Sequence, residues 1–178
     1  MDRQVVETSL PSSRPARLHY AVGSRMHNHG RAAAIFLLLA FCPFVGLGED
    51  AREANAAVEQ VLMRQVEAWN HHDLESFMAG YWNSPQLTFF SAGTKTSGWQ
   101  STLERYRRRY QAEGREMGNL RFSDLEVESL GADSAFVRGA WQLTTADGKN
   151  PHGLFTLIFR KFPEGWKIIH DHTSEAER

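Results

Sequence analysis

The sequence predicts an α+β domain in which three helices lie on the concave face of a curved antiparallel sheet. Two observations support this prediction. Apolar residues recur at helical spacing between residues 55 and 110, whereas a period of two begins at Asn119. Helices and strands that are segregated along the chain in this way favour helices packed on one face of an antiparallel sheet. The segment 49–178 has the length of a single domain.

The first two helices are predicted from an apolar stripe and a capping residue. Between residues 55 and 70, apolar side chains recur at spacings of four, four and three: Val58, Leu62, Val66 and Trp69. This spacing places them on one side of an amphipathic helix. Asp73 can cap a second, shorter helix from Leu74 to Tyr81, because an aspartate there accepts a hydrogen bond from a free backbone N–H.

A short hairpin and a third helix follow. Residues 87–91 are rich in strand formers, and a turn at Ala92 and Gly93 leads to a return strand at 94–96. From residue 97 onward, apolar side chains again recur at helical spacing: Trp99, Leu103, Tyr106 and Tyr110. The other side of this helix carries a basic run, which we interpret as a solvated face rather than an anion site: Arg105, Arg107, Arg108 and Arg109.

Four long strands are predicted over residues 120–130, 134–146, 153–162 and 166–174, joined by turns that contain Gly, Pro and Asp. Such strands form an antiparallel meander. In the first strand, Leu120 and Phe122 are even-numbered whereas Leu125 and Val127 are odd-numbered. This change of phase predicts a β-bulge near 123–124, which would curl the sheet.

Residues 1–48 are interpreted as an N-terminal leader with a signal peptide. Arg25 and Arg31 precede an apolar run at 32–47, which Pro43 interrupts. A membrane span needs about 20 apolar residues, so this run is short for one. A basic flank and a short apolar core are typical of a secretory signal. We expect cleavage after Gly48 and export to the periplasm or the medium, with no membrane attachment afterwards; an uncleaved anchor is the alternative.

Composition argues against two classes of function. After residue 31 the chain holds fifteen Lys or Arg and nineteen Asp or Glu, a formal charge of −4, whereas nucleic-acid binding needs a basic patch. The one cysteine, Cys42, lies in the leader. The domain therefore has no thiol for catalysis, for a disulfide or for a metal site.

Three segments carry a resemblance to a known family: AWNHHDL at 68–74, FMAGYW at 77–82 and GWKIIHDHTS at 165–174. They resemble the SnoaL-like branch of the nuclear transport factor 2-like superfamily, within it the group named domain of unknown function 4440. The resemblance covers roughly residues 55–174. It implies a cystatin-like cone with a pocket between sheet and helices, and a homodimer formed through the outer sheet face. It does not imply one activity, because relatives include isomerases, cyclases, dehydratases and association domains.

The resemblance also suggests which side chains line the pocket: Trp69, Tyr81, Trp82, Phe89, Tyr106, Trp141 and His170. Strand alternation places Trp166, Ile168, His170 and His172 on one face of the last strand. Asn70, Arg138 and His172 are further ligand-binding candidates. Many aromatic rings with few polar groups suit a small, flat, hydrophobic ligand; simple core packing is the alternative for each ring.

His170 and Asp73 are the candidates for a general base, because histidine titrates near neutral pH and a carboxylate could orient it. Hydrogen bonding of His170 and His172 to the end of the first helix is the structural alternative. With Asp73 or His71, the two histidines could hold a divalent ion, but no zinc-type spacing supports this. We expect neither a metal nor another cofactor. The strands offer Arg138 and His170 where an inward Asp or Glu is needed, which argues against isomerase or cyclase activity.

Three functions remain open at this point. The first is an exported, dimeric module that binds a small hydrophobic molecule without catalysis. The second is a lyase or isomerase that uses His170 or Asp73 as a base on a carbonyl compound. The third is a protein-association domain. A buried carboxylate with a raised pKa in an apolar pocket would favour the enzyme, and a cavity without such a group would favour binding alone.

Overall fold

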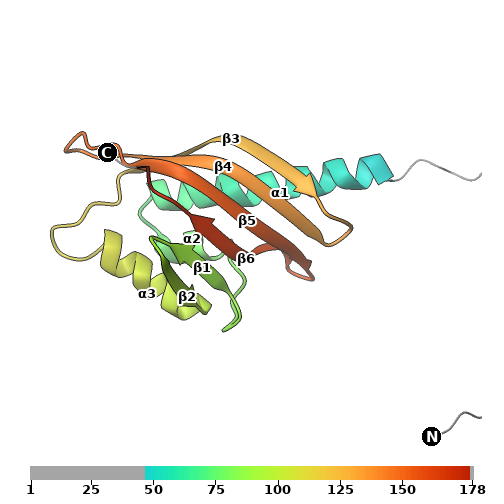
Figure 1. The fold of residues 1–178 in the computed structure, drawn as a ribbon, viewed down its shortest axis with the longest axis horizontal. Helices are drawn as coiled ribbons and strands as arrows, with labels where there is room; N and C mark the ends of the chain where they lie inside the picture. Colours follow the sequence, from blue (N-terminus) through green and yellow to red (C-terminus); the bar gives the residue numbers. More distant parts are fainter. Residues whose placement is uncertain (1–46, 177–178) are drawn as a thin grey trace, which may run out of the picture. The chain divides into compact units, whose positions relative to one another are not determined.

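The computed structural model describes residues 47–176 and confirms the α+β fold (Figure 1). The elements follow the predicted order of two helices, a short hairpin, a third helix and four long strands. Residues 1–46 of the predicted leader, which include nearly all of the predicted signal peptide, lie outside the described residues. None of the helices within residues 47–176 is long and apolar enough to cross a bilayer.

The first helix, α1 (Leu47–Asn70), begins well before the predicted start at residue 55. Its first turn contains Glu49 and Asp50, whose negative charges stabilise a helix N-terminus. The spacing of apolar residues does not reveal these charges, so the predicted start of the helix was too late. Three members of the predicted stripe are buried in the core: Val58, Leu62 and Trp69.

The second helix, α2 (Leu74–Met78), is capped as predicted, because the Asp73 carboxylate accepts a hydrogen bond from the backbone N–H of Ser76. The helix ends before Tyr81, which instead forms a β-bridge to Ile168. The third helix, α3 (Trp99–Tyr110), begins after Gly98. The φ of Gly98 is +92°, a conformation that favours glycine.

The sheet has six strands in the order β2-β1-β6-β5-β4-β3. The last four strands of the chain form the predicted antiparallel meander: β3 (Asn119–Ser129), β4 (Ser134–Thr144), β5 (His152–Phe162) and β6 (Gly165–Thr173). The predicted hairpin consists of β1 (Thr88–Ser91) and β2 (Thr94–Ser97). β1 pairs in parallel with β6, which places the hairpin at the edge of the meander.

Two register shifts interrupt the pairing of the strands. The shift on β3 lies between Ser123 and Glu126 and confirms the predicted bulge. The shift on β6 was not predicted: His170 pairs with Ile158 and Ile168 pairs with Phe159, so Ile169 has no partner. One extra residue reverses which side chains face inward.

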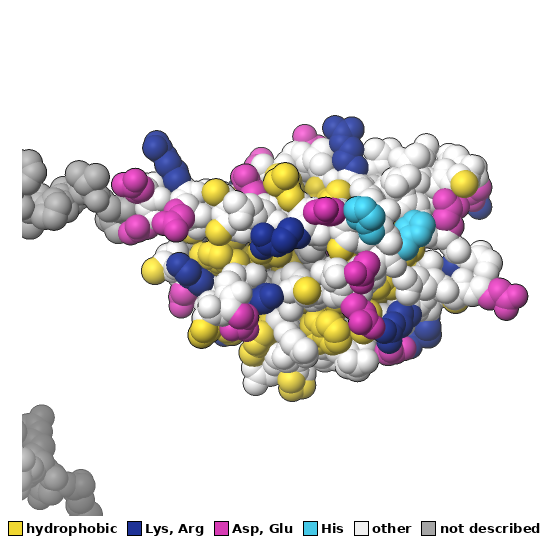
Figure 2. Space-filling view, turned by 180° about the vertical axis from the view of Figure 1, so that it is seen from behind, with side chains coloured by type: hydrophobic (Ala, Val, Ile, Leu, Met, Phe, Trp, Pro, Cys, Tyr) yellow, Lys and Arg dark blue, Asp and Glu magenta, His cyan; other side chains and the backbone are white. Residues whose placement is uncertain are grey.

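The helices cover the concave face of the curved sheet, and α1 runs behind the long strands in Figure 1. The inner faces of β4 and β5 carry buried side chains: Ala135, Val137, Trp141, Leu143, Phe155, Leu157 and Phe159. These side chains and the α1 stripe belong to one hydrophobic core. On the side seen in Figure 2, basic and acidic side chains are interspersed, with apolar ones between them.

Candidate functional site

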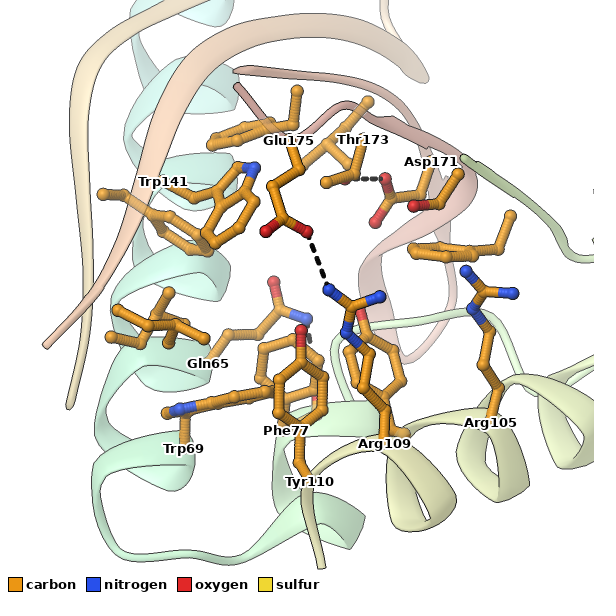
Figure 3. Close-up of a pocket in the computed structure, with 18 of the residues that line it drawn as sticks. Gln65, Trp69, Phe77, Arg105, Arg109, Tyr110, Trp141, Asp171, Thr173 and Glu175 are labelled. Carbon is orange, nitrogen blue, oxygen red and sulfur yellow. Dashed lines mark hydrogen bonds and ion pairs between the residues drawn. The ribbon is translucent and has the colours of Figure 1, made fainter. Parts of the chain in front are cut away.

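A recess lies between the helices and the concave face of the sheet (Figure 3). Its cavity has a volume of about 90 Å³. The wall receives side chains from all three helices, from every strand except β2, and from the segment that follows β6. Residues far apart in the sequence therefore meet only after the sheet has curved around the helices.

Aromatic rings form a large part of the wall. The ring centroid of Trp69 lies 4.8 Å from that of Tyr110 and 5.1 Å from that of Phe77. Tyr106 extends the cluster, at 5.3 Å from Phe77 and 5.7 Å from Phe89. All four contacts are edge-to-face, a favourable geometry for aromatic pairs. The indole N–H of Trp69 donates to backbone carbonyls, so the recess meets the apolar part of that ring.

One carboxyl group lies in this apolar wall. Asp171 is 3% exposed, and its two oxygens accept hydrogen bonds from the hydroxyls of Tyr81 and Thr173, both at 2.7 Å. Burial raises the pKa of Asp171 to about 6, although both hydrogen bonds act in the opposite direction. The carboxyl group can therefore gain or lose a proton close to neutral pH.

Two tyrosine hydroxyls stand beside this carboxyl group. The Tyr81 and Tyr106 hydroxyls are 3.5 Å apart, and burial raises the pKa of both groups well above the ordinary value. The negative charge of Asp171 raises both pKa values further. Both groups consequently stay protonated at neutral pH and can act as hydrogen-bond donors.

Charged side chains stand where the recess meets solvent. Arg105 and Arg109 rise side by side from α3 in Figure 3, and Glu175 reaches toward them from the opposite side. Arg109 and Glu175 form an ion pair at 2.8 Å. The guanidinium of Arg105 lies over the Phe89 ring, 5.3 Å from its centroid. Arg105 is only partly exposed, so the prediction of a solvated basic face on α3 is wrong for this residue, whereas Arg109 is exposed as predicted.

Gln65 contributes a polar group from α1. Its side chain is buried, and its Nε2 donates to the Phe77 carbonyl at 3.1 Å. In Figure 3 its carbonyl oxygen points into the recess. Gly80 allows this position, because a β-carbon there would lie 2.8 Å from the Gln65 side chain.

The sequence pattern described as the SnoaL-like domain matches residues 58–176, which include the core and the recess. The chain belongs to the SnoaL-like domain family. This confirms the predicted membership of the nuclear transport factor 2-like superfamily; the finer assignment to domain of unknown function 4440 stays a prediction. Among the curated proteins, none is significantly similar to this chain.

Solved structures share the fold of this SnoaL-like domain. An NTF-2-like protein of unknown function from Shewanella oneidensis is 37% identical, with a TM-score of 0.63 over 67% of this chain and 97% of that one. A ketosteroid isomerase-like protein from Erwinia carotovora is 23% identical, with a TM-score of 0.59 over 71% of this chain and 98% of that one. A cystatin-like fold protein from Nostoc punctiforme is 12% identical, with a TM-score of 0.57 over 68% and 90%.

The SnoaL-like domain brings together five of the side chains predicted to line the pocket: Trp69, Tyr81, Phe89, Tyr106 and Trp141. Two other candidates lie outside the recess. Trp82 stacks on Phe162, with ring centroids 5.3 Å apart. Asn70 exchanges two hydrogen bonds with the backbone of Leu120, which join the end of α1 to the start of β3.

The predicted positions of His170 and His172 require a correction. Because Ile169 is an extra residue, both histidines face the outer side of the sheet, and Asp171 occupies the inward position between them. His170 contacts Thr88 of β1, with 2.6 Å between its Nδ1 and the threonine hydroxyl, so it does not reach the end of α1. Burial, and then the charge of His172, lower the pKa of His170.

Arg138 also lies on the outer face, where it pairs with Glu126 at 2.9 Å. Strand alternation explains this position, because its neighbours Val137 and Gly139 are both buried. Asp73 is exposed and serves as the α2 cap, and the Ser76 hydrogen bonds lower its pKa. None of His170, His172, Arg138 and Asp73 contributes to the wall of the recess.

The inward carboxyl group was not predicted. The sequence pattern indicated no inward Asp or Glu on the strands, whereas Asp171 is one. The one signal in the sequence is the adjacent apolar pair Ile168 and Ile169, which breaks the alternation as Phe122 and Leu125 do on β3. Within residues 47–176, no cluster of three or more His, Cys, Asp or Glu side chains could hold a metal ion.

Proposed function

We propose that this SnoaL-like domain binds a small, flat, mainly apolar molecule in the aromatic recess and that Asp171 transfers a proton at that molecule. The observation that carries the proposal is the position of Asp171, a buried carboxyl group with a pKa raised to about 6 in a wall rich in aromatic rings. A general acid or base is most effective when its pKa lies near the working pH. A purely structural carboxyl group would not need to face a cavity.

The reaction class that suits these groups is proton transfer beside a carbonyl, as in an isomerase or a lyase. Asp171 in its charged form would accept a proton from the carbon next to the carbonyl. The negative charge would then develop on the carbonyl oxygen. A tyrosine hydroxyl that stays protonated is a suitable donor to such an oxygen, and the Tyr106 hydroxyl stands in the wall beside Tyr81. This assigns Asp171 the role first predicted for His170 or Asp73.

Binding without catalysis is the second candidate. It would need the same recess but no titratable group in it, and Asp171 is the feature that favours the enzyme instead. The third hypothesis, protein association, is supported least, because neither the cavity nor the buried carboxyl group serves it.

Exchange of a carbon-bound hydrogen for deuterium tests the proposal without knowledge of the product. Acetophenone has one ring and exchangeable hydrogens beside a carbonyl, and its exchange in D₂O can be followed by NMR. We expect the protein to accelerate this exchange. Loss of a general base typically lowers a rate by about a hundredfold or more. Asp171→Asn should therefore lower the rate of exchange by about a hundredfold or more.

Asp73→Asn is the matched control, since it removes an exposed carboxylate, and it should leave the exchange rate unchanged. An Asp171→Asn variant that still catalyses exchange at the wild-type rate would contradict the catalytic role. Wild-type protein that binds acetophenone without accelerating exchange would favour binding alone.

We also propose that the chain is exported, on the basis of the basic flank and short apolar run of residues 25–48. Expression of the full chain in a bacterium, followed by fractionation and intact-mass measurement, tests this. A periplasmic product that begins at Glu49 is expected, and a full-length product in the cytoplasm would contradict it.

A further inference from the structure

We infer that the ligand is a small carboxylic acid whose carboxylate binds Arg105 at the mouth of the recess. The inference depends on the proposed small-molecule site and specifies the chemical class of its ligand. It is supported by the size of the cavity, the charges around Arg105 and the location of the competing negative groups.

The cavity is too small to enclose a whole ligand of ordinary size. Its volume is about 90 Å³, which is smaller than an apolar cavity of about 150 Å³ that binds a benzene molecule. The inner part of the recess therefore does not enclose a ring together with its substituents. The remainder of the ligand must lie toward the mouth, beside Arg105, Arg109 and Glu175.

Of the two arginines that line the recess, Arg105 and Arg109, Arg105 is the one available to a ligand. Arg107 pairs with Glu75 and Glu104, and Arg109 pairs with Glu175. Among the described residues, no ion pair includes Arg105. Its guanidinium instead lies over the Phe89 ring, a contact that holds the planar group at the recess and leaves its N–H donors free.

A carboxylate matches the geometry of this group. A guanidinium presents parallel N–H donors that bind both oxygens of a carboxylate at once. The apolar part of the ligand would then continue inward along Phe89 and Tyr106. Asp171 is buried in the same wall, and its negative charge would disfavour a pose that places the ligand carboxylate beside it.

Glu175 provides an independent test of the same site. Its carboxylate forms an ion pair with Arg109 at the same mouth, where its negative charge would repel an anionic ligand. Removal of the Glu175 charge should therefore strengthen the binding of a carboxylic acid and leave a neutral ligand unaffected.

Calorimetric titration of benzoate and phenylacetate against their neutral amides, benzamide and phenylacetamide, tests the inference. In the wild-type protein we expect each acid to bind about tenfold more tightly than its amide. Arg105→Gln should reduce this ratio to about one, Arg105→Lys should leave part of it, and Glu175→Gln should increase it. Arg108→Gln is the matched control, because Arg108 is exposed on the same helix and does not line the recess.

The outcomes separate the inference from the proposed function. If the amides bind as tightly as the acids, or if Arg105→Gln and Arg108→Gln preserve the same ratio, the carboxylate site is wrong while the recess remains a small-molecule site. If none of the four compounds binds, both proposals fail. Phenylphosphonate binding more tightly than both acids would also overturn the choice of a carboxylate.

Discussion

The ionisation of Asp171 depends on two opposing effects. Removal from water disfavours the charged carboxylate, whereas the hydroxyls of Tyr81 and Thr173 stabilise it by hydrogen bonding. Burial is the larger effect, because the pKa rises from 3.8 to about 6. The folded protein consequently binds a proton more tightly at this position than the unfolded chain does.

This difference predicts how stability depends on pH. A carboxyl group with a raised folded-state pKa stabilises the fold fully below pH 3.8, and this contribution is lost as the pH rises through about 6. The difference in pKa corresponds to about 3 kcal/mol. We expect Asp171→Asn, which cannot ionise, to gain up to that amount relative to wild type between pH 4 and pH 8.

Urea unfolding of both proteins at several pH values measures this difference. Asp147→Asn is a suitable comparison, because hydrogen bonds from Lys149 and Thr145 lower the pKa of this exposed carboxylate. Asp147 is therefore ionised in both the folded and the unfolded state above pH 4, and its difference from wild type should stay constant from pH 4 to pH 8. A free-energy difference between wild type and Asp171→Asn that stays constant from pH 4 to pH 8 would show that the Asp171 pKa is not raised.

The aromatic rings of the site were predictable from the sequence, whereas the buried carboxyl group was not. Trp69, Tyr81, Phe89, Tyr106 and Trp141 could be found from the sequence, because large aromatic side chains on helix stripes and strand faces are buried in most arrangements. Asp171 could not be found in this way, because the face of the sheet to which its side chain points depends on a single extra residue in the same strand.

At the scale of elements, the segment after β6 closes one side of the recess. The indole N–H of Trp141 donates to the Ser174 carbonyl at 2.9 Å, and the backbone N–H of Ser174 donates to the Leu154 carbonyl at 2.9 Å. Gly153 lies beneath this contact. A β-carbon at Gly153 would overlap the Ser174 carbonyl and lie 2.9 Å from the Trp141 Nε1.

Gly153→Ala should therefore displace this segment and break the bond between Trp141 and Ser174. Overpacking of this kind costs about 1–3 kcal/mol of unfolding free energy, which a urea melt can measure. A chain truncated after Thr173 has already lost the segment, so Gly153→Ala should cost much less in that background. An equal cost in both backgrounds would show that the alanine acts elsewhere.

Local patterns explain which elements were predictable. The three helices, the hairpin, the meander and the β3 bulge all leave a period or a turn in the sequence. The early start of α1 coincides with acidic residues in its first turn, and α2 ends just before Gly80, which packs against Gln65; apolar spacing records neither feature. The parallel pairing of β1 with β6 joins residues about 80 positions apart, so no local pattern records it.

For the whole molecule, the outer face of the sheet is where a second copy is expected. Three apolar side chains on the outer face of β1 and β5 reach solvent: Leu154 (65% exposed), Ile158 (37%) and Phe90 (36%). Phe90 packs edge-to-face against His170 of β6, the strand between β1 and β5. This patch lies on the face that the helices leave open, so two copies related by a two-fold axis could bury the same patch on each other.

We propose a homodimer through this face and predict that Leu154→Glu combined with Ile158→Glu yields a monomer, because pairing would then bury four carboxylates without partners. Sedimentation velocity over a range of concentrations measures the state directly. Leu130→Glu is the matched control, since Leu130 is 57% exposed but lies between β3 and β4, away from the patch, and this variant should remain a dimer. A wild-type protein that sediments as a monomer at every concentration, or a double variant that still dimerises, would exclude the outer face as the interface.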